Sequence, residues 1–248
     1  MASFLTDMKS LLGDRRRLRS FVVDSKCVPW RARAFFKRRF LVAYRILRYG
    51  RLNINTAAHW DEIWGREGLG TWRQYPERFA RIANLVPVGA RVLDVGCGVG
   101  VLLRRLRRDA HCEVFGIDIS LSAIRTLKGI GVHGAVGVVP QLPVATAAFD
   151  VVTATELLEH VDDPLATLLE LARCLRPGGL LIVTTPDNAL APWEEDHHMQ
   201  VFVRDTLDSM ASCVLKEFQV ESLQEHWSRN GETITENILF LHGRTEAL

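Results

Sequence analysis

The sequence predicts an α/β protein built on a doubly wound, mostly parallel sheet, and three observations lead to that prediction. From about residue 90, short runs rich in Val and Ile alternate with segments of helical periodicity. A glycine-rich segment directly follows the first of these runs. Residues typical of helix starts and stops bound several of the segments. Such alternation of strands and helices is typical of a parallel sheet covered by helices.

The expected elements follow one another regularly along the chain. Strands are predicted at residues 91–95, 113–118, 132–139, 149–154 and 180–185, and helices at 99–109, 120–128 and 164–175. Beyond residue 185 the pattern is weaker. A helix is predicted there at 204–213, and two late strands, at 218–223 and 234–241, are expected to form a hairpin at the sheet edge.

Local signals define the helix at 164–175 most sharply. Asp163 is a suitable N-cap residue, and Pro164 suits the first helical position because its missing N–H would have no helical partner. The Arg-Pro-Gly-Gly segment at 176–179 should end the helix, since proline cannot continue it and glycine tolerates a left-handed cap.

The part of the chain before residue 88 is predicted to be helical. Candidate helices lie at 57–64 and 75–86, and a third at 33–48 carries an apolar stripe with basic flanks. The stripe consists of Phe36, Phe40, Tyr44 and Leu47. We therefore expect a basic helical N-terminal extension over residues 1–55 and a main domain over residues 56–248.

Charge is distributed unevenly over the 248 residues, although the net charge is only +2. Residues 1–51 hold 14 Lys and Arg against three Asp and Glu, whereas the remainder holds 17 against 26. The basic segment over residues 1–51, called the arm below, is therefore expected to bind an anionic partner. Three candidate partners remain: an anionic membrane, the acidic body of the protein or a second copy of it, and RNA. The apolar stripe favours the membrane and the protein over RNA. We therefore expect either a peripheral contact with a membrane or packing within the protein or a homodimer, and we do not expect nucleic acid as a partner.

The cysteines and the apolar runs indicate in which cellular compartment the protein is expected. There are five cysteines, an odd number, without any C-x-x-C pair, which favours a reducing cytoplasmic setting over a disulfide framework or a zinc knuckle. No apolar run approaches the roughly 18 residues of a membrane span, and the N-terminus does not have the pattern of a signal peptide. The predicted localisation is cytoplasmic, with the arm as a candidate for peripheral membrane contact.

The glycine-rich segment over residues 92–100 predicts a ligand site. Gly96, Gly98 and Gly100 lie between a strand and a helix, where the backbone can approach a ligand closely and the helix N-terminus offers free N–H groups. A dinucleotide fingerprint would need a third glycine where Val101 stands. Asp94, at the end of the strand, instead suits a ligand with a cationic amino group.

A second acid sharpens this prediction. Asp118 ends the second strand, 20 residues after Gly98. An acid at this offset from a glycine-rich loop can accept hydrogen bonds from both hydroxyls of a ribose.

With these motifs, the chain resembles the class I S-adenosylmethionine-dependent methyltransferase superfamily over about residues 89–186. It is most similar to the small-molecule methyltransferases of the ubiquinone-biosynthesis O-methyltransferase type, through the Glu-x-x-Glu-His-Val motif at 156–161 and the Asp-Pro that follows. Further matching segments lie at 93–98, 116–120, 142–143, 149–152, 175–180 and 184–188. The resemblance implies S-adenosyl-L-methionine as the cofactor and a Rossmann-like sheet of seven strands, with the last antiparallel, for the domain at 56–248.

The resemblance also implies roles for individual residues. Asp94, Gly96, Gly98 and Gly100 would line the methionine end of the cofactor, Asp118 would bind the ribose, Ile119 would contact the adenine, and Thr155 would contact the cofactor through its backbone. The family often has an acid for the adenine amine where this chain has Val138. Adenine recognition would then depend on the backbone of Val139, on Gln141, or on shape alone.

The catalytic residues are less clearly marked. Methyl transfer from a sulfonium needs a base only when the acceptor is protonated, as a hydroxyl is. His160, His197 and His198 are the candidate bases, although His160 could instead orient its loop, and the histidine pair at 197–198 could belong to a solvated loop. Glu156, Glu159 and His160 could share a helix face, but we expect no metal there.

Aromatic residues upstream of the first strand suggest a cap. Trp72 and Tyr75 could cover the cofactor, or could pack in the core.

Three functions are compatible with these features. The first is methylation of a small-molecule acceptor, lipid-linked or hydroxylated, by in-line transfer. The second is methylation of RNA by use of the basic arm, but residues 155–158 read Thr-Glu-Leu-Leu instead of the Asn/Asp-Pro-Pro-aromatic motif usual for base amines. The third is a cofactor-binding module without catalysis.

Overall fold

The computed structural model describes residues 41–49, 52–66, 75–187, 197–229 and 232–246. The chain forms two compact units, one comprising Met1–Ile54 with Ala191–His197, the other Asn55–Leu190 with His198–Leu248. In the first unit, helix α4 spans Leu41–Tyr49 and buries Tyr44. Arg45 of this helix donates to the carbonyl oxygen of Leu52 at 3.3 Å. The predicted helix at 33–48 is thus helical from residue 41; residues 33–40 lie outside the described part.

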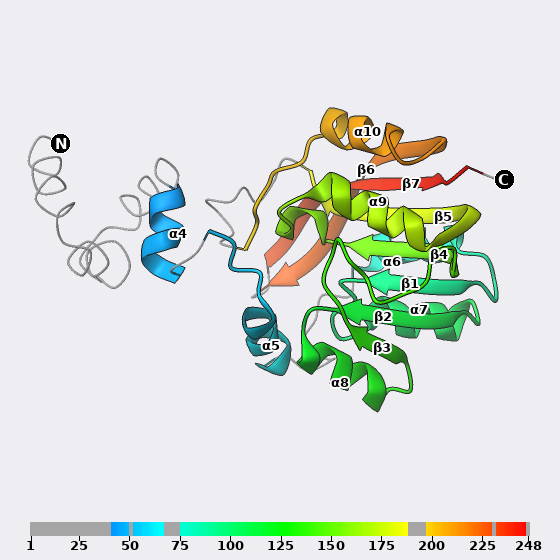
Figure 1. The fold of residues 1–248 in the computed structure, drawn as a ribbon, viewed down its shortest axis with the longest axis horizontal. Coiled ribbons are helices and arrows are strands. Elements are labelled where there is room, and N and C mark those ends of the chain that lie inside the picture. Colours follow the sequence, from blue (N-terminus) through cyan, green and yellow to red (C-terminus); the bar gives the residue numbers. More distant parts are fainter. Residues whose placement is uncertain (1–40, 50–51, 67–74, 188–196, 230–231, 247–248) are drawn as a thin grey trace, which may run out of the picture. The chain divides into compact units, whose positions relative to one another are not determined.

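The second unit contains one seven-stranded sheet in the order β3-β2-β1-β4-β5-β7-β6 (Figure 1). The first five strands are parallel, and β7 runs antiparallel to both of its neighbours. The predicted fold class is confirmed. The strands are β1 (Arg91–Val95), β2 (Glu113–Asp118), β3 (His133–Val136), β4 (Phe149–Thr155), β5 (Leu175–Pro186), β6 (Glu217–Arg229) and β7 (Glu232–Arg244).

Helices cover both faces of this sheet. On one face, α6, α7 and α8 pack on side chains such as Val92 and Phe240, and on the other α9 and α10 pack on Leu93 and Leu241. Val92 and Leu93 are neighbours in β1 and point to opposite faces, as alternation along a strand requires. The helices are α5 (Ala57–Arg66), α6 (Pro76–Leu85), α7 (Val101–Asp109), α8 (Leu121–Gly129), α9 (Pro164–Cys174) and α10 (Arg204–Ser212), with a 3-10 turn, η2, at Leu158–His160.

The predicted boundaries of α9 can be compared directly with the structure. The carboxylate of Asp163 accepts from the backbone N–H of Ala166 at 3.0 Å, which confirms the N-cap. The helix ends at Cys174, one residue before the predicted end, but the chain enters β5 at once, whereas the strand was predicted to begin at residue 180. Gly178, with φ of 72°, lies within that strand, where the pairing with β4 shifts register.

Other elements differ in length from the prediction. The third strand is shorter, because Val138 and Gln141 form an isolated antiparallel bridge that turns the chain. The late hairpin is confirmed and is longer, with 13 residues in each strand. No helix in the described part of the chain combines the length and apolarity needed to cross a membrane.

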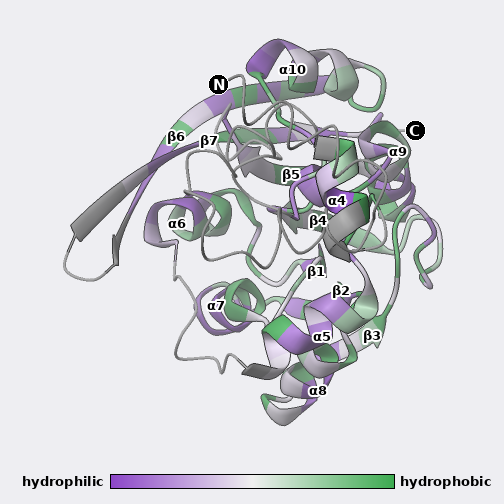
Figure 2. Ribbon diagram, turned by 90° about the vertical axis from the view of Figure 1, so that its left-hand side faces the viewer, coloured by the Kyte–Doolittle hydropathy of each residue, from purple (hydrophilic) through white to green (hydrophobic). Residues whose placement is uncertain are grey.

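Part of the late hairpin extends beyond the rest of the sheet. The pairing of β5 with β7 ends at Pro186 and Ile238, whereas β6 and β7 stay paired as far as Arg229 and Glu232. Figure 2 shows the two strands running outwards together, with α6 nearby. This projecting portion, residues 224–229 and 232–237, is called the ribbon below.

Candidate functional site

The candidate site lies at the carboxyl ends of β1, β2 and β4. The chain passes from β1 to β2 and β3 on one side, then crosses back to β4 on the other side of β1. Doubly wound proteins bind their ligands at the carboxyl edge of the sheet, where the strand order reverses in this way.

The glycine-rich turn between β1 and α7 has the backbone that its sequence predicts. Gly96, Gly98 and Gly100 all have positive φ, of 74°, 50° and 80°. At Gly98 space is restricted as well, because a Cβ would lie 2.5 Å from the indole ring of Trp64. Any side chain at Gly98 would therefore both strain the backbone and collide with that ring.

Asp118 ties this turn to the end of β2. Its carboxylate accepts from the backbone N–H of Gly98 at 2.9 Å and from that of Ser120 at 2.8 Å. The residue is 6% exposed, and burial raises the pKa of its carboxyl group. The structure thus brings the two predicted motifs together through a direct hydrogen bond.

Asp94 is the second buried acid of the site. Its carboxylate accepts from the hydroxyl of Thr153 at 2.7 Å, and the residue is 1% exposed. Burial, with a further contribution from the charge of Asp118, raises the pKa of Asp94 to about 7. Neither acid forms an ion pair with a basic side chain in the described part of the chain. A cationic ligand group would stabilise the ionised form of Asp94.

Helix α5 covers the glycine-rich turn. Asp61 accepts from the hydroxyl of Ser120 at 2.6 Å and from the backbone N–H of Ser122 at 2.9 Å, which ties α5 to the start of α8. Trp64 lies over Gly98, and Trp60 stacks on Trp64 with ring centroids 6.1 Å apart. An aromatic cap is therefore present, but it is built from α5.

The two aromatic residues predicted for the cap have different outcomes. Trp72 lies outside the described residues. Tyr75 precedes α6, and its ring lies against the guanidinium group of Arg78, 4.2 Å from centroid to Cζ. In the described part of the chain, Tyr75 also contacts Phe79 edge-on.

Arg78 is a fully buried cation near the end of β4. Its Nη1 atom lies 2.9 Å from Oε1 of Glu156, and its Nε atom donates to Glu225 at 3.3 Å. Nη2 is buried without a hydrogen-bond acceptor among the described residues. Buried donors are normally satisfied, so Nη2 indicates a place for an anionic ligand group.

The turn after β4 corrects one prediction. Glu156, Glu159 and His160 do not share a helix face, because Glu156 has a φ of 53° and only Leu158–His160 form a short 3-10 turn. Glu156 is held at the end of β4 by its backbone N–H, which donates to the carbonyl oxygen of Thr184 at 2.9 Å. The predicted cofactor contact Thr155 is the last residue of β4, at this same edge.

Glu159 is buried beside this turn. It accepts from the hydroxyl of Thr185 at 3.1 Å, and its second oxygen lies 3.8 Å from Nε2 of His160. Burial, aided by the charge of Glu156, raises the pKa of Glu159 well above its usual value. In its ionised form, this carboxylate could stabilise a protonated His160.

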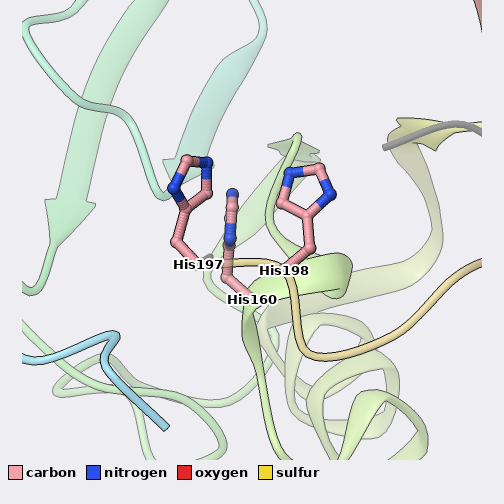
Figure 3. A group of neighbouring side chains, drawn as sticks. All are labelled: His160, His197 and His198. Carbon is pink, nitrogen blue, oxygen red and sulfur yellow. The ribbon is translucent and has the colours of Figure 1, made fainter. Parts of the chain in front are cut away.

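Two of the three predicted bases come together. The rings of His160 and His198 lie edge to face with centroids 5.0 Å apart (Figure 3). Trp60 of the cap packs edge-on against His160 at 5.2 Å, so the histidine pair adjoins the covered cofactor turn. Asn55 donates to the carbonyl oxygen of His160 at 2.9 Å. His197 is the last residue of the first unit, and its role stays a prediction.

The predicted adenine contacts lie at the ends of β2 and β3. Ile119 directly follows Asp118 and is half-buried. Val138 is 53% exposed, and Val139 is half-buried and packs against the core. The contribution of the Val139 backbone to adenine recognition stays a prediction.

A comparison with protein families decides the class of this site. Residues 66–236 match the model of a family described as a methyltransferase domain. The chain belongs to this methyltransferase family. The match includes the glycine-rich turn, both buried acids and the turn after β4.

Relatives of this methyltransferase cover part of its length. It is 40% identical over 110 residues to the ubiquinone biosynthesis O-methyltransferase of Xanthomonas axonopodis pv. citri, which is 42% of this chain and 46% of that protein. It is 36% identical over 145 residues to the Xylella fastidiosa protein of the same name, 55% of this chain and 57% of the relative. The chain therefore spans about half the length of these relatives.

Solved structures share the fold of the methyltransferase. A possible histamine N-methyltransferase from Thermotoga maritima has a TM-score of 0.56 at 20% identity, over 69% of this chain and 89% of its own. A putative methyltransferase of Haloferax volcanii, in complex with an activator, has a TM-score of 0.60 at 19% identity, over 75% of this chain and 97% of its own. A cyclase has a TM-score of 0.55 at 20% identity, over 73% of this chain and 86% of its own. At these identities the likeness concerns the fold alone.

Sequence reasoning missed two parts of the methyltransferase site, and each left a signal. Trp60 and Trp64 are four residues apart in a predicted helix, so they had to share a face. Arg78 lies three residues after Tyr75 and four before Ile82, which places a charge on the apolar face of its helix. A charged residue on a buried stripe requires a partner, and neither Glu156 nor Glu225 is near in sequence.

Proposed function

We propose that this methyltransferase transfers the methyl group of S-adenosylmethionine to a small-molecule acceptor. The observation that carries the proposal is the pair of buried acids, Asp94 and Asp118, at the ends of adjacent strands beside the glycine-rich turn. Neither acid is neutralised by a basic side chain among the described residues. A ligand with an amino group and a ribose would satisfy both.

The residues of the site fit such a cofactor from end to end. Asp94 would bind the amino group, Nη2 of Arg78 would bind the carboxylate, and Asp118 would bind the ribose hydroxyls. Gly96, Gly98, Gly100 and the backbone of Thr155 would line the methionine end, and Ile119 and Val139 would lie against the adenine. When bound, the cofactor would supply an electrophilic methyl group on a sulfonium, and the aromatic rings of Trp60 and Trp64 would favour that positive charge.

We propose a hydroxyl as the methylated group of the acceptor. The curated relatives are named O-methyltransferases. The His160–His198 pair supports the same proposal, because a hydroxyl must lose its proton as it attacks, and imidazole has a suitable basicity near neutral pH. An imidazolium at His160 would in turn favour the ionised form of Glu159, whose carboxyl oxygen lies 3.8 Å from Nε2.

The test is transfer of radiolabelled methyl from S-adenosylmethionine. Three acceptors are compared: a fraction of small metabolites, a lipid extract and total RNA, with the Asp118→Ala variant as the blank. Label in a metabolite or lipid supports the proposal and distinguishes the two acceptor classes. Label in RNA alone would contradict the proposal and would identify the protein as an RNA methyltransferase. Cofactor binding without transfer to any of the three would favour a module without catalysis.

A further inference from the structure

The N-terminus of helix α6 lacks a cap of its own. Tyr75, at the N-cap position, has φ of 20° and makes no side-chain hydrogen bond to the helix. Pro76, the first helical residue, has no N–H. The first N–H groups that need an acceptor are therefore those of Glu77 and Arg78.

Both groups donate to one carboxylate from a distant part of the chain. The N–H of Glu77 donates to Oε1 of Glu225 at 3.1 Å, and the N–H of Arg78 lies 3.3 Å and 3.2 Å from its two oxygens. Glu225 is 0% exposed and belongs to the ribbon portion of β6, 147 residues further along the chain. It caps α6 from another element, where the helix dipole favours a negative charge.

The same carboxylate also orients the side chain of Arg78. Oε2 of Glu225 accepts from Nε at 3.3 Å, so this edge of the guanidinium is occupied. Tyr75 packs against the guanidinium face, and Glu156 lies beside Nη1. Because a guanidinium is planar and rigid, fixing Nε also fixes the direction of the Nη1–Nη2 edge. On that edge Nη1 is paired with Glu156, and Nη2 is buried without a hydrogen-bond acceptor among the described residues.

We propose that Glu225 is a positioning residue, which holds the guanidinium of Arg78 so that its Nη2 atom receives the carboxylate of the cofactor. The inference rests on the proposed function and deepens it. It connects the ribbon of the late hairpin to the methionine end of the cofactor site. Glu225 does not itself contact the cofactor.

A neighbouring ion pair provides a matched control. One helical turn after Arg78, Arg81 of α6 donates to Glu221 of β6 at 2.5 Å. This pair joins the same two elements and is partly exposed. The Glu221→Gln variant therefore weakens the packing of α6 on β6 without removing a partner of Arg78.

The experiment measures binding of two compounds to the full chain by calorimetry. S-Adenosylhomocysteine carries the amino-acid end of the cofactor, whereas 5′-methylthioadenosine lacks it and keeps the ribose and adenine. Glu225→Gln should weaken binding of S-adenosylhomocysteine about tenfold or more and leave binding of methylthioadenosine within about twofold, because charge-assisted pairs to a carboxylate are lost selectively. Arg78→Lys should show the same selectivity, and Glu221→Gln should show none.

The outcomes separate the inference from the proposed function. If Glu225→Gln weakens both compounds equally, or if Glu221→Gln shows the same selectivity, Glu225 supports the fold and does not position Arg78. Should the glutamine variant fail to fold, Arg78→Lys still decides, since an unselective effect there would overturn the inference. Wild-type protein that binds neither compound would overturn the proposed function and the inference together.

Discussion

The hydroxyl of Thr153 donates to the carboxylate of Asp94 at 2.7 Å, across the pairing of β4 with β1. This hydrogen bond favours the charged form of Asp94. Burial outweighs it and raises the pKa to about 7. The charge state of the acid proposed to bind the cofactor amino group therefore changes near neutral pH.

The first prediction concerns pH. Only ionised Asp94 pairs with an amino group, so the affinity for S-adenosylhomocysteine should rise with pH up to about 7 and then level off, falling about tenfold per unit below that value. Calorimetry in buffers of different ionisation enthalpy should detect a proton released on binding near pH 6. In Asp94→Asn, this pH dependence and the proton release should disappear, and their persistence would assign them to another group.

The same residue should affect stability in a defined direction. The folded pKa of Asp94 lies above its usual value, so its contribution to stability is full below about pH 4 and is lost as pH rises through about 7. Asp94→Asn stays neutral throughout. Its unfolding free energy, relative to wild type, should therefore increase between pH 5 and pH 8 in urea denaturation, and a constant difference would contradict a raised pKa.

The second prediction concerns Asp118. Asp118→Ala removes the proposed acceptor for the ribose and the hydrogen bond to Gly98, so binding of both S-adenosylmethionine and its demethylated product should weaken. The expected loss of binding free energy is that of two charge-assisted hydrogen bonds, about 1.5–3 kcal/mol each. Asp109→Ala, which removes an exposed acid paired with Arg108, serves as the control in calorimetry. Unchanged affinity in Asp118→Ala would remove the residue from the site.

The third prediction concerns the cap formed by α5. Gly98→Ala should destabilise the protein for two reasons, a collision with the ring of Trp64 and the strain of a positive φ, which costs on the order of 1–2 kcal/mol. In a Trp64→Ala background only the strain should remain. A double-mutant cycle by chemical denaturation measures the difference. Strictly additive effects would mean that Trp64 does not occupy this position in solution.

The fourth prediction concerns the acceptor base. If a hydroxyl is methylated, replacing His160 or His198 by Ala should lower turnover by about 10²–10⁴-fold without changing cofactor affinity. His133, exposed on the edge strand β3, provides the control substitution. His197→Ala belongs in the same series, since its role is open. Losses of only a few-fold in all three variants would favour an acceptor that needs no base.

The fifth prediction concerns residues 1–51. Their excess of basic residues should bind vesicles that contain an anionic lipid more strongly than neutral vesicles, by about 1 kcal/mol for each basic residue at the surface. Added salt should weaken this binding. Co-sedimentation compares the full chain with a variant lacking residues 1–51. No retention by anionic vesicles at low salt would exclude the membrane contact, and a lower melting temperature of the truncated chain would then support packing within the protein.

Local patterns explain why the sheet and the cofactor turn could be predicted. The Val- and Ile-rich runs, the glycines at 96, 98 and 100, and the Asp163 cap are each determined by residues close together in sequence. The position of Asp118 beside the turn could be predicted because its offset from Gly98 is set by one strand–helix–strand unit.

Long-range contacts explain what could not be predicted. The partnership of Arg78 with Glu225 joins residues 147 apart, and no periodicity relates them. The turn after β4 resembled a helix face, because spacing alone cannot show that Glu156 adopts a left-handed backbone. The length of the late hairpin was underestimated, since polar residues such as Gln224 and Asn237 pair in the ribbon without an apolar pattern.

The ribbon has a consequence for the dynamics of the cofactor site. Glu225 of the edge strand β6 pairs with Glu236 of β7 beyond Ile238, the last residue of β7 that pairs with β5, so the two strands are held there only by each other. Two-stranded segments open more readily than the centre of a sheet, and amide hydrogen exchange reports such opening. Each opening would withdraw the acceptor from α6 and release Arg78. Local unfolding of the hairpin and loss of cofactor affinity would then be a single event, and an acceptor or partner that clamps the hairpin would tighten cofactor binding from a distance.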